Sequence, residues 1–150
     1  MIARFLIYGL IGWCAEIVWT ALYELVTGTR KDPLDVTIRV RMTPPERWRL
    51  MGHTYLWMLP VYGLGGLAFE PLHELVRAWP WLLRGSFWAL GCFAVEYAAG
   101  LALRRLGGRC PWDYSYARWN VGGLIRLDYT PVWFLFGLAL ERVHDAVAGL

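Results

Sequence analysis

Charge is the scarcest property of this 150-residue chain. Asp, Glu, Lys and Arg make up only 18% of it, whereas about a quarter of a soluble domain is charged. Hydrophobic residues make up 57%, with ten Trp and eight Tyr. A water-soluble chain of this composition would expose large apolar patches. The composition therefore predicts an integral membrane protein, and the alternative is a soluble all-α bundle with an unusually large core.

Three further shortages exclude particular functions. The cysteines Cys14, Cys92 and Cys110 are odd in number, and their spacing fits neither a disulfide framework nor a zinc site. The chain has no Gly-x-x-x-x-Gly-Lys-Ser/Thr phosphate loop, so it is not itself an ATPase of that type. Its basic residues are spread over loops without a known reading motif, so we expect no nucleic-acid partner.

Long apolar runs are present, but each is interrupted by charge. Four of them approach the roughly 20 residues that cross a bilayer core, at Ile2–Val26, Thr54–Val76, Trp81–Leu103 and Tyr129–Ala148. They predict an all-α, polytopic membrane four-helix bundle that forms a single transmembrane domain over residues 1–150. The first run is too long for the core of a signal peptide and lacks a small-residue cleavage site, so we expect it to be retained.

The distribution of basic residues predicts the orientation of these helices. Eleven Lys and Arg lie in the two long loops, residues 27–53 and 104–128, and four lie on the opposite side. By the positive-inside rule the loops face the cytoplasm and both termini lie outside, in what we expect to be a bacterial inner membrane. The loops either only set this topology or also contact anionic membrane lipids. A homo-oligomer is a further expectation, because four helices alone make a thin wall around a transport path.

Two stretches of the chain resemble each other at an offset of 71 residues. Residues 60–74 read PVYGLGGLAFEPLHE and residues 131–145 read PVWFLFGLALERVHD, and eight of these fifteen positions are identical. The first and third helices match more weakly at an offset of 80, where Arg4 and Glu16 fall on Arg84 and Glu96. The pattern predicts a tandem two-helix repeat whose copies are related by a pseudo-twofold axis along the membrane normal.

Each predicted helix carries one glutamate near its middle, namely Glu16, Glu70, Glu96 and Glu141. A carboxylate inside a membrane is costly and is a functional residue by default. Because helical side chains lean toward their own N-terminus, the four carboxylates are predicted to converge. Small residues lie four and seven positions before them, where they permit close helix packing: Gly9, Gly12, Gly63, Gly66, Ala89, Cys92 and Gly137.

A histidine follows two of these glutamates at a spacing of three. Two Glu-x-x-His pairs, with one Glu from each of two other helices, are the ligand set of di-iron and di-manganese carboxylate bundles. The sequence therefore predicts a dinuclear iron or manganese centre with six ligands, Glu16, Glu70, His73, Glu96, Glu141 and His144. Two interpretations stay open beside it. The histidines either bind a haem or lie near the outer membrane surface, solvated or paired with Glu74 and Asp145.

The first long loop contains two signals of regular structure. Val36–Met42 alternates apolar and polar residues, which indicates a short strand. Thr43-Pro44-Pro45-Glu46 has the capping box and early prolines that begin a helix.

The second long loop carries the most specific motif of the chain. It contains Cys110-Pro111-Trp112-Asp113-Tyr114-Ser115, and then Gly123-Leu124-Ile125. On these residues, and on Glu16, Tyr62-Gly63 and Glu96, the chain resembles the transmembrane protein 229 family of animals and bacterial membrane proteins labelled as type IV ABC-transporter permeases. The resemblance covers roughly Arg4–Glu141 and implies a membrane location and transport. The animal pattern has other residues at the His73 and His144 positions, so it implies no metal site there.

The loop motif has a structural and a functional interpretation. As a structural element it caps the bundle at the headgroup layer, where aromatic residues are favoured, and it consists of Trp112, Tyr114, Ser115, Asn120 and Gly123. As a functional element it binds a phosphate headgroup or another anion, since arginine forks fit phosphate, and its residues are then Arg109, Asp113, Arg118 and Arg126.

Three functions follow from these residues. The first is a metal-containing oxidoreductase that acts on a lipophilic substrate, which needs all six ligands at one level. The second is a permease-like transport component whose glutamates bind protons or cations, which needs a polar path to them. The third is a non-catalytic membrane scaffold whose buried carboxylates are paired with tyrosines and arginines.

Overall fold

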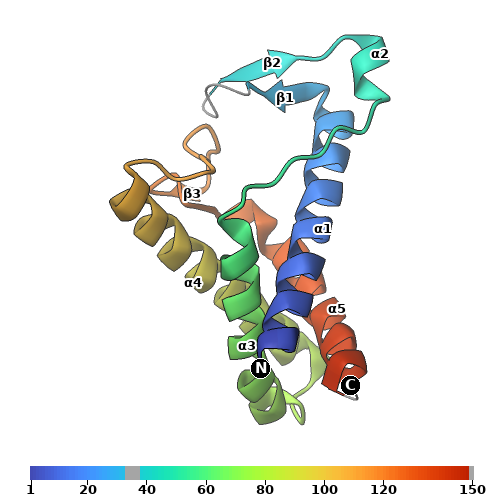
Figure 1. The fold of residues 1–150 in the computed structure, drawn as a ribbon, viewed down its shortest axis with the longest axis vertical. Coiled ribbons are helices and arrows are strands. Elements are labelled where there is room, and N and C mark those ends of the chain that lie inside the picture. Colours follow the sequence, from blue (N-terminus) through green and yellow to red (C-terminus); the bar gives the residue numbers. More distant parts are fainter. Residues whose placement is uncertain (33–37, 149–150) are drawn as a thin grey trace. The chain divides into compact units, whose positions relative to one another are not determined.

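The computed structural model describes residues 1–32 and 38–148. The chain divides into two compact units, residues 1–67 (unit 1) and residues 68–150 (unit 2), and the division falls within α3. Whether the units form one membrane domain stays a prediction. Figure 1 shows the described elements as a ribbon. They are α1 Ile2–Thr27, β1 Thr29–Lys31, β2 Arg39–Arg41, α2 Pro44–Arg47, α3 Met58–Val76, α4 Trp81–Gly107, β3 Asn120–Val121, β4 Ile125–Arg126, the 3₁₀ helix η1 Leu127–Tyr129, and α5 Thr130–Ala148.

Two of the described helices, α1 and α4, are long and apolar enough to cross a membrane. They have 26 and 27 residues, and many of their large apolar side chains are exposed, such as Val18 in α1 and Leu90 in α4. Exposed apolar surface of this extent is costly in water and is compatible with lipid. The two helices therefore suggest a membrane protein. The other two predicted spans, α3 and α5, have 19 residues each.

Glycines end the two long helices. Gly28 and Gly108 follow α1 and α4 with φ of 66° and 73°, a conformation that glycine adopts without the penalty of a Cβ atom. The N–H of Gly28 donates to the carbonyl of Glu24 at 2.8 Å, which satisfies one backbone acceptor at the end of α1. The third helix was predicted to end at Leu103, which is four residues too early. Good helix formers continue up to the pair Gly107-Gly108.

In unit 1 an extended segment precedes α3, and it runs along α1 (Figure 1). The second helix begins at Met58, four residues after the predicted start at about Thr54, because the backbone here bonds to side chains of α1 instead. The hydroxyl of Thr20 accepts from the N–H of His53 at 2.9 Å and donates to its carbonyl at 3.0 Å. The indole N–H of Trp13 donates to the carbonyl of Tyr55 at 3.0 Å.

Glycines allow α1 and the first part of α3 to pack closely. A Cβ atom at Gly66 would overlap the side chain of Tyr8, and one at Gly12 would overlap Tyr62. A larger residue at either position would push the two helices apart, so the small residues predicted on these helix faces are required for the close packing.

The loop between α1 and α3 forms a short antiparallel pair, β1–β2, in which Arg30 lies opposite Val40. Part of the predicted strand, Arg39–Arg41, is β2, and residues 36 and 37 lie outside the described residues. The predicted helix start is confirmed in α2, where the carboxylate of Glu46 accepts from the backbone N–H of Thr43 at 2.8 Å and from its hydroxyl at 2.7 Å.

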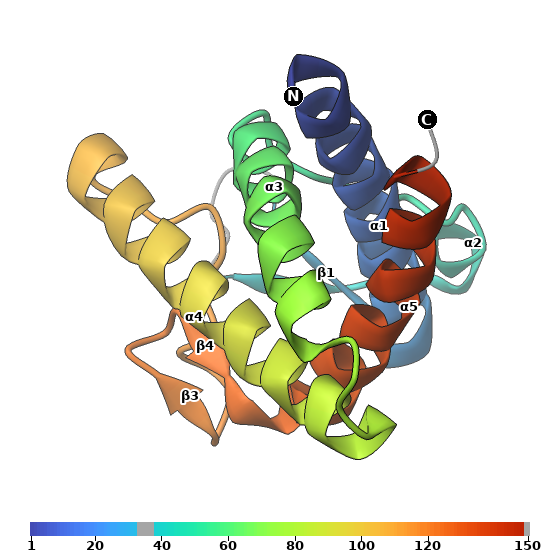
Figure 2. The same cartoon turned by 90° about the horizontal axis from the view of Figure 1, so that it is seen from below.

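Unit 2 is built on the pair α4 and α5, with the last part of α3 packed against it (Figure 2). Phe69, Val76 and Trp88 form its buried apolar cluster. A Cβ atom at Gly137 would overlap the Cβ atom of Trp88, and one at Gly85 would overlap the ring of Phe134.

The loop between α4 and α5 is a folded cap on the end of α4. The indole N–H of Trp112 donates to the carbonyl of Leu124 at 2.8 Å, and Leu124 is 1% exposed. Strands β3 and β4 pair through a turn at Gly122 and Gly123, whose φ values of 60° and 70° are those of the tight turns that favour hairpins. Figure 2 shows this hairpin beside α4.

The glycine at the α4–α5 contact yields a stability prediction. We expect Gly137→Ala to lower the free energy of unfolding by about 1–3 kcal/mol, because the new methyl group meets a Cβ atom that no rotamer change can move. Thermal unfolding of the detergent-purified protein measures this. The matched control is Gly91→Ala in α4, where nothing lies within 4 Å of the added Cβ. Equal unfolding temperatures for the two variants would contradict the close contact.

Candidate functional site

An ion pair between α4 and α5 is the centre of the candidate site. Nε of Arg84 donates to Oε1 and Oε2 of Glu141 at 2.9 and 3.2 Å. The indole N–H of Trp88 donates to Oε1 of Glu141 at 2.8 Å. Glu141 is 5% exposed, so its charge has little contact with solvent. A buried carboxylate is tolerated only when it is paired and hydrogen-bonded in this way.

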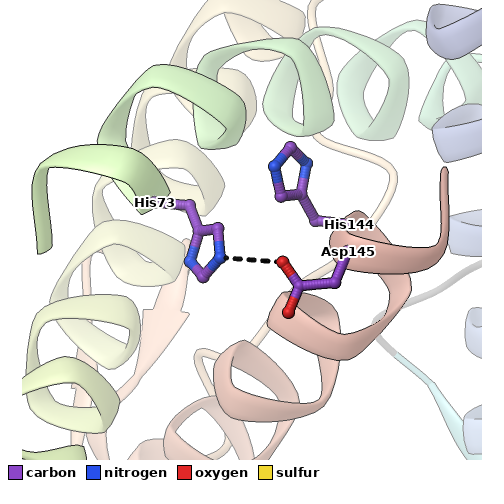
Figure 3. Close-up of side chains that lie close together, drawn as sticks. All are labelled: His73, His144 and Asp145. Carbon is purple, nitrogen blue, oxygen red and sulfur yellow. Dashed lines mark ion pairs between the residues drawn. The ribbon is translucent and has the colours of Figure 1, made fainter. Parts of the chain in front are cut away.

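Two buried histidines lie beside this ion pair, one from α3 and one from α5. His73 and His144 are 3% and 5% exposed, and their ring centroids are 5.0 Å apart. Nδ1 of His73 lies 3.7 Å from Oε1 of Glu141, and Nε2 lies 3.4 Å from Oδ1 of Asp145. Figure 3 shows His73 facing Asp145, with His144 close by. His73 therefore lies between a buried and an exposed carboxylate.

Charged side chains at the exposed edge of the site pair with one another. Nη2 of Arg77 lies 2.6 Å from Oδ1 of Asp145, 3.2 Å from Oε1 of Glu74 and 3.3 Å from Nε2 of His73. Nε2 of His144 lies 3.8 Å from Glu74. The structure thus has the contacts to Glu74 and Asp145 that one interpretation of the sequence expected, but both histidines are buried rather than solvated.

Unit 2 contains five of the six predicted metal ligands and does not bring all five together. Of them, unit 2 brings together His73, Glu141 and His144. Glu70 lies three residues before His73 on α3. Glu96 lies twelve residues after Arg84 on α4, which is about 18 Å along a helix axis. The carboxylates of Glu96 and Glu141 do not converge. Glu141 accepts from Arg84 and Trp88 near the start of α4, whereas Glu96 accepts from Tyr114 in the loop that follows α4.

Glu16 belongs to unit 1 and has a separate environment. Its Oε2 accepts from the hydroxyl of Thr54 at 2.6 Å and from that of Tyr62 at 3.1 Å. Both donors are neutral. This carboxylate therefore differs from Glu141, whose closest partner is a guanidinium group.

Three residues of the unit 2 site were not predicted from the sequence: Arg77, Arg84 and Trp88. A signal existed for Arg84, which falls on Arg4 at the offset of 80. The repeat includes Arg84, but the sequence does not show that it pairs with Glu141.

Three side chains of the site have the composition of a metal site. One ligand atom from each of His73, His144 and Asp145 lies within 4.8 Å of the others, among the described residues. Two imidazoles and one carboxylate suit iron, manganese or zinc. The guanidinium group of Arg77 would compete with a metal ion, because it contacts Nε2 of His73 and Oδ1 of Asp145.

At the other end of α4, Glu96 accepts a hydrogen bond of 2.9 Å from the hydroxyl of Tyr114. Loss of contact with water raises the pKa of the Tyr114 phenol well above its usual range, and the charge of Glu96 raises it further. The phenol therefore stays protonated and donates. Asp113 accepts from the N–H and hydroxyl of Ser115 at 2.9 and 2.6 Å, directly beside Gly123.

The predicted anion-binding residues of this loop have contacts within the fold. Arg126 pairs with Asp128 and lies over the ring of Tyr129, 4.3 Å from its centroid. Arg118 lies over the ring of Trp119, and Arg109 is exposed. These contacts favour the structural interpretation of the loop, and anion binding stays a prediction.

The contact between the loop and Glu96 leads to a second stability prediction. We expect Tyr114→Phe to lower the free energy of unfolding by about 1.5–3 kcal/mol, because it removes a hydrogen bond to a charged group. The control is Tyr97→Phe in α4, since the side chain of Tyr97 is 39% exposed. Combining Tyr114→Phe with Glu96→Gln in a double-mutant cycle isolates the pair. A coupling energy of zero would show that the contact does not stabilise the loop.

Comparison with known proteins finds a family for the chain. The family model described as "Putative ABC-transporter type IV" matches residues 3–149. No solved structure matches the chain.

Proposed function

The chain belongs to this ABC-transporter type IV family, and on that premise we propose that it is a permease-like membrane component that moves ions past the network around Glu141. The observation that supports this most is the row of polar groups from exposed Asp145 through His73 to buried Glu141. A transport component needs such a path through apolar helices.

The ion pair is better explained by function than by stability. Replacing a buried ion pair with apolar side chains of similar volume is often neutral or stabilising. A chain that retains Arg84 and Glu141 among apolar helices therefore gains little stability from the charges. Intramembrane charges of this kind mark ion or substrate pathways.

The proposal includes four membrane spans in a repeated two-helix unit, with cytoplasmic long loops and external termini. Two equivalent contacts support the repeat. Gly66 contacts Tyr8 in unit 1, and Gly137 contacts Trp88 in unit 2, which are the same positions after offsets of 71 and 80. Gly63 and Phe5 correspond to Phe134 and Gly85, where the glycine and the aromatic residue are exchanged between helices.

These 150 residues contain no phosphate loop. In this proposal the energy for transport therefore comes from an ion gradient or from an ATPase. A homo-oligomer and contacts with membrane lipids belong to the same proposal. The resemblance to the animal transmembrane protein 229 family stays a prediction.

Ion flux in proteoliposomes tests the transport function. We expect the wild-type protein to conduct H⁺ or Na⁺ under an imposed gradient, read with a pH-sensitive dye and with ²²Na⁺. Glu141→Gln should lower the flux roughly tenfold, which corresponds to a free-energy barrier for ion passage that is higher by about 1.4 kcal/mol. Glu46→Gln, in the exposed helix α2, is the control. An absence of flux in the wild type, or equal flux in Glu141→Gln, would reject the proposal.

Metal binding at His73, His144 and Asp145 is the second candidate function, because their ligand atoms lie within 4.8 Å of one another. One metal ion suits this group better than two, since Glu96 lies at another level of α4. A haem suits it less well, because imidazole rings with centroids 5.0 Å apart leave no room for a macrocycle between them. An oxidoreductase acting on a lipophilic substrate would follow only from a bound redox metal.

Metal analysis of the purified protein tests this candidate. We expect about one equivalent of iron, manganese or zinc per chain, and its loss in His144→Ala, because three ligands are reduced to two. His53→Ala is the matched control, since His53 is the third histidine of the chain and lies in unit 1. Two equivalents with an absorption band in the visible spectrum would instead support the dinuclear centre. Metal-free protein in every form would eliminate both metal sites.

A further inference from the structure

The second predicted span of the chain is discontinuous, because an extended segment comes before its helix. The segment at Gly52–Tyr55 is bound to Trp13 and Thr20 of α1. Gly52 lies so close to the carbonyl of Ile17 that a Cβ atom there would overlap it. The segment therefore follows the second half of α1 rather than lying free in the loop.

This segment lies near the middle of α1. The helix runs from Ile2 to Thr27, so Thr20 is about 8 Å along the axis from its midpoint and Glu16 is about 2 Å from it. If α1 spans the bilayer, the extended backbone is at membrane depth. Irregular backbone at this depth is tolerated only where it is buried in protein or lines a water-filled cavity.

Glu16 is the charged group of this part of unit 1. Thr54 and Tyr62 donate hydroxyl hydrogen bonds to one of its oxygens, Oε2. Within the described residues of unit 1, no arginine, lysine or histidine forms an ion pair with it. Neutral donors leave the carboxylate without a directly bound counter-charge, and the nearest cationic influence comes from Lys31 at longer range. A charge in this setting is costly away from water. A bound cation would remove that cost.

The oxygen atoms here match the chemistry of an alkali-metal ion. A carboxylate, two hydroxyl groups and the carbonyls of non-helical backbone are hard oxygen ligands. One carboxylate balances one positive charge, whereas Ca²⁺ sites usually gather several carboxylates. Discontinuous membrane helices coordinate Na⁺ in this way in secondary transporters, through carbonyls that an unwound segment leaves available.

We propose that Glu16, Thr54 and Tyr62, together with the extended segment before α3, form a binding site for a monovalent alkali cation. The site supplies the ion of the proposed transport function and in that sense rests on it. Binding itself is measured without transport, so the two proposals fail separately. If the wild-type protein binds the cation but shows no ion flux in proteoliposomes, the transport function alone is rejected.

Thermal unfolding of the detergent-solubilised full chain tests the site. The protein is measured in NaCl, KCl and choline chloride at equal ionic strength. We expect Na⁺ or K⁺, but not choline, to raise the unfolding temperature by roughly 3–6 °C near saturation. The difference between the Na⁺ and K⁺ titrations identifies the preferred ion.

Variants locate the effect. Glu16→Gln still accepts both hydroxyl hydrogen bonds but lacks the charge, so we expect it to lose the cation-dependent shift. Thr54→Val removes one hydroxyl group at nearly constant volume and should weaken the apparent affinity roughly tenfold, the effect of about 1.4 kcal/mol. Glu46→Gln, which changes a carboxylate that caps α2 in the loop of unit 1, should keep the full shift. A shift of equal size in choline, no shift in any salt, or an unchanged shift in both Glu16→Gln and Thr54→Val would overturn the proposal.

Discussion

Glu141 is 5% exposed, and Arg84 and Trp88 both donate hydrogen bonds to it. The cost of removing a carboxylate from water makes these partners necessary, since an unpaired charge in an apolar interior is not tolerated. Arg84 in turn donates to the carbonyls of Arg77 and Trp79 near the start of α4. One buried charge thus ties the end of α3, the start of α4 and the last turns of α5 together.

The same constraint is met differently at two of the other mid-helix glutamates, Glu96 and Glu16. Glu96 accepts from Tyr114 in the loop after its helix, and Glu16 accepts from Thr54 in the segment before α3 and from Tyr62 of α3. In both cases an irregular segment supplies a neutral hydroxyl donor. The loops are therefore part of the environment of these carboxylates.

Close helix contacts are the second requirement of the fold. In lipid the association of helices depends on van der Waals packing and hydrogen bonds, so small residues must lie opposite large ones. Gly66 with Tyr8 and Gly137 with Trp88 meet this requirement within each unit. Each aromatic residue lies eight positions before the glutamate of its helix.

Composition and local motifs were enough to predict the helical class, the membrane character suggested by α1 and α4, the capping box of α2 and the bacterial ABC-transporter family. These features depend on composition and on contacts within a few residues. Which partner each glutamate contacts follows instead from the packing of the folded chain. Glu141 is joined to Arg84, Glu96 to Tyr114 and Glu16 to Thr54, over 57, 18 and 38 residues. Hydrophobic periodicity places a side chain on a face of its helix, but the level of its partner depends on how helices and loops pack, which no local pattern encodes.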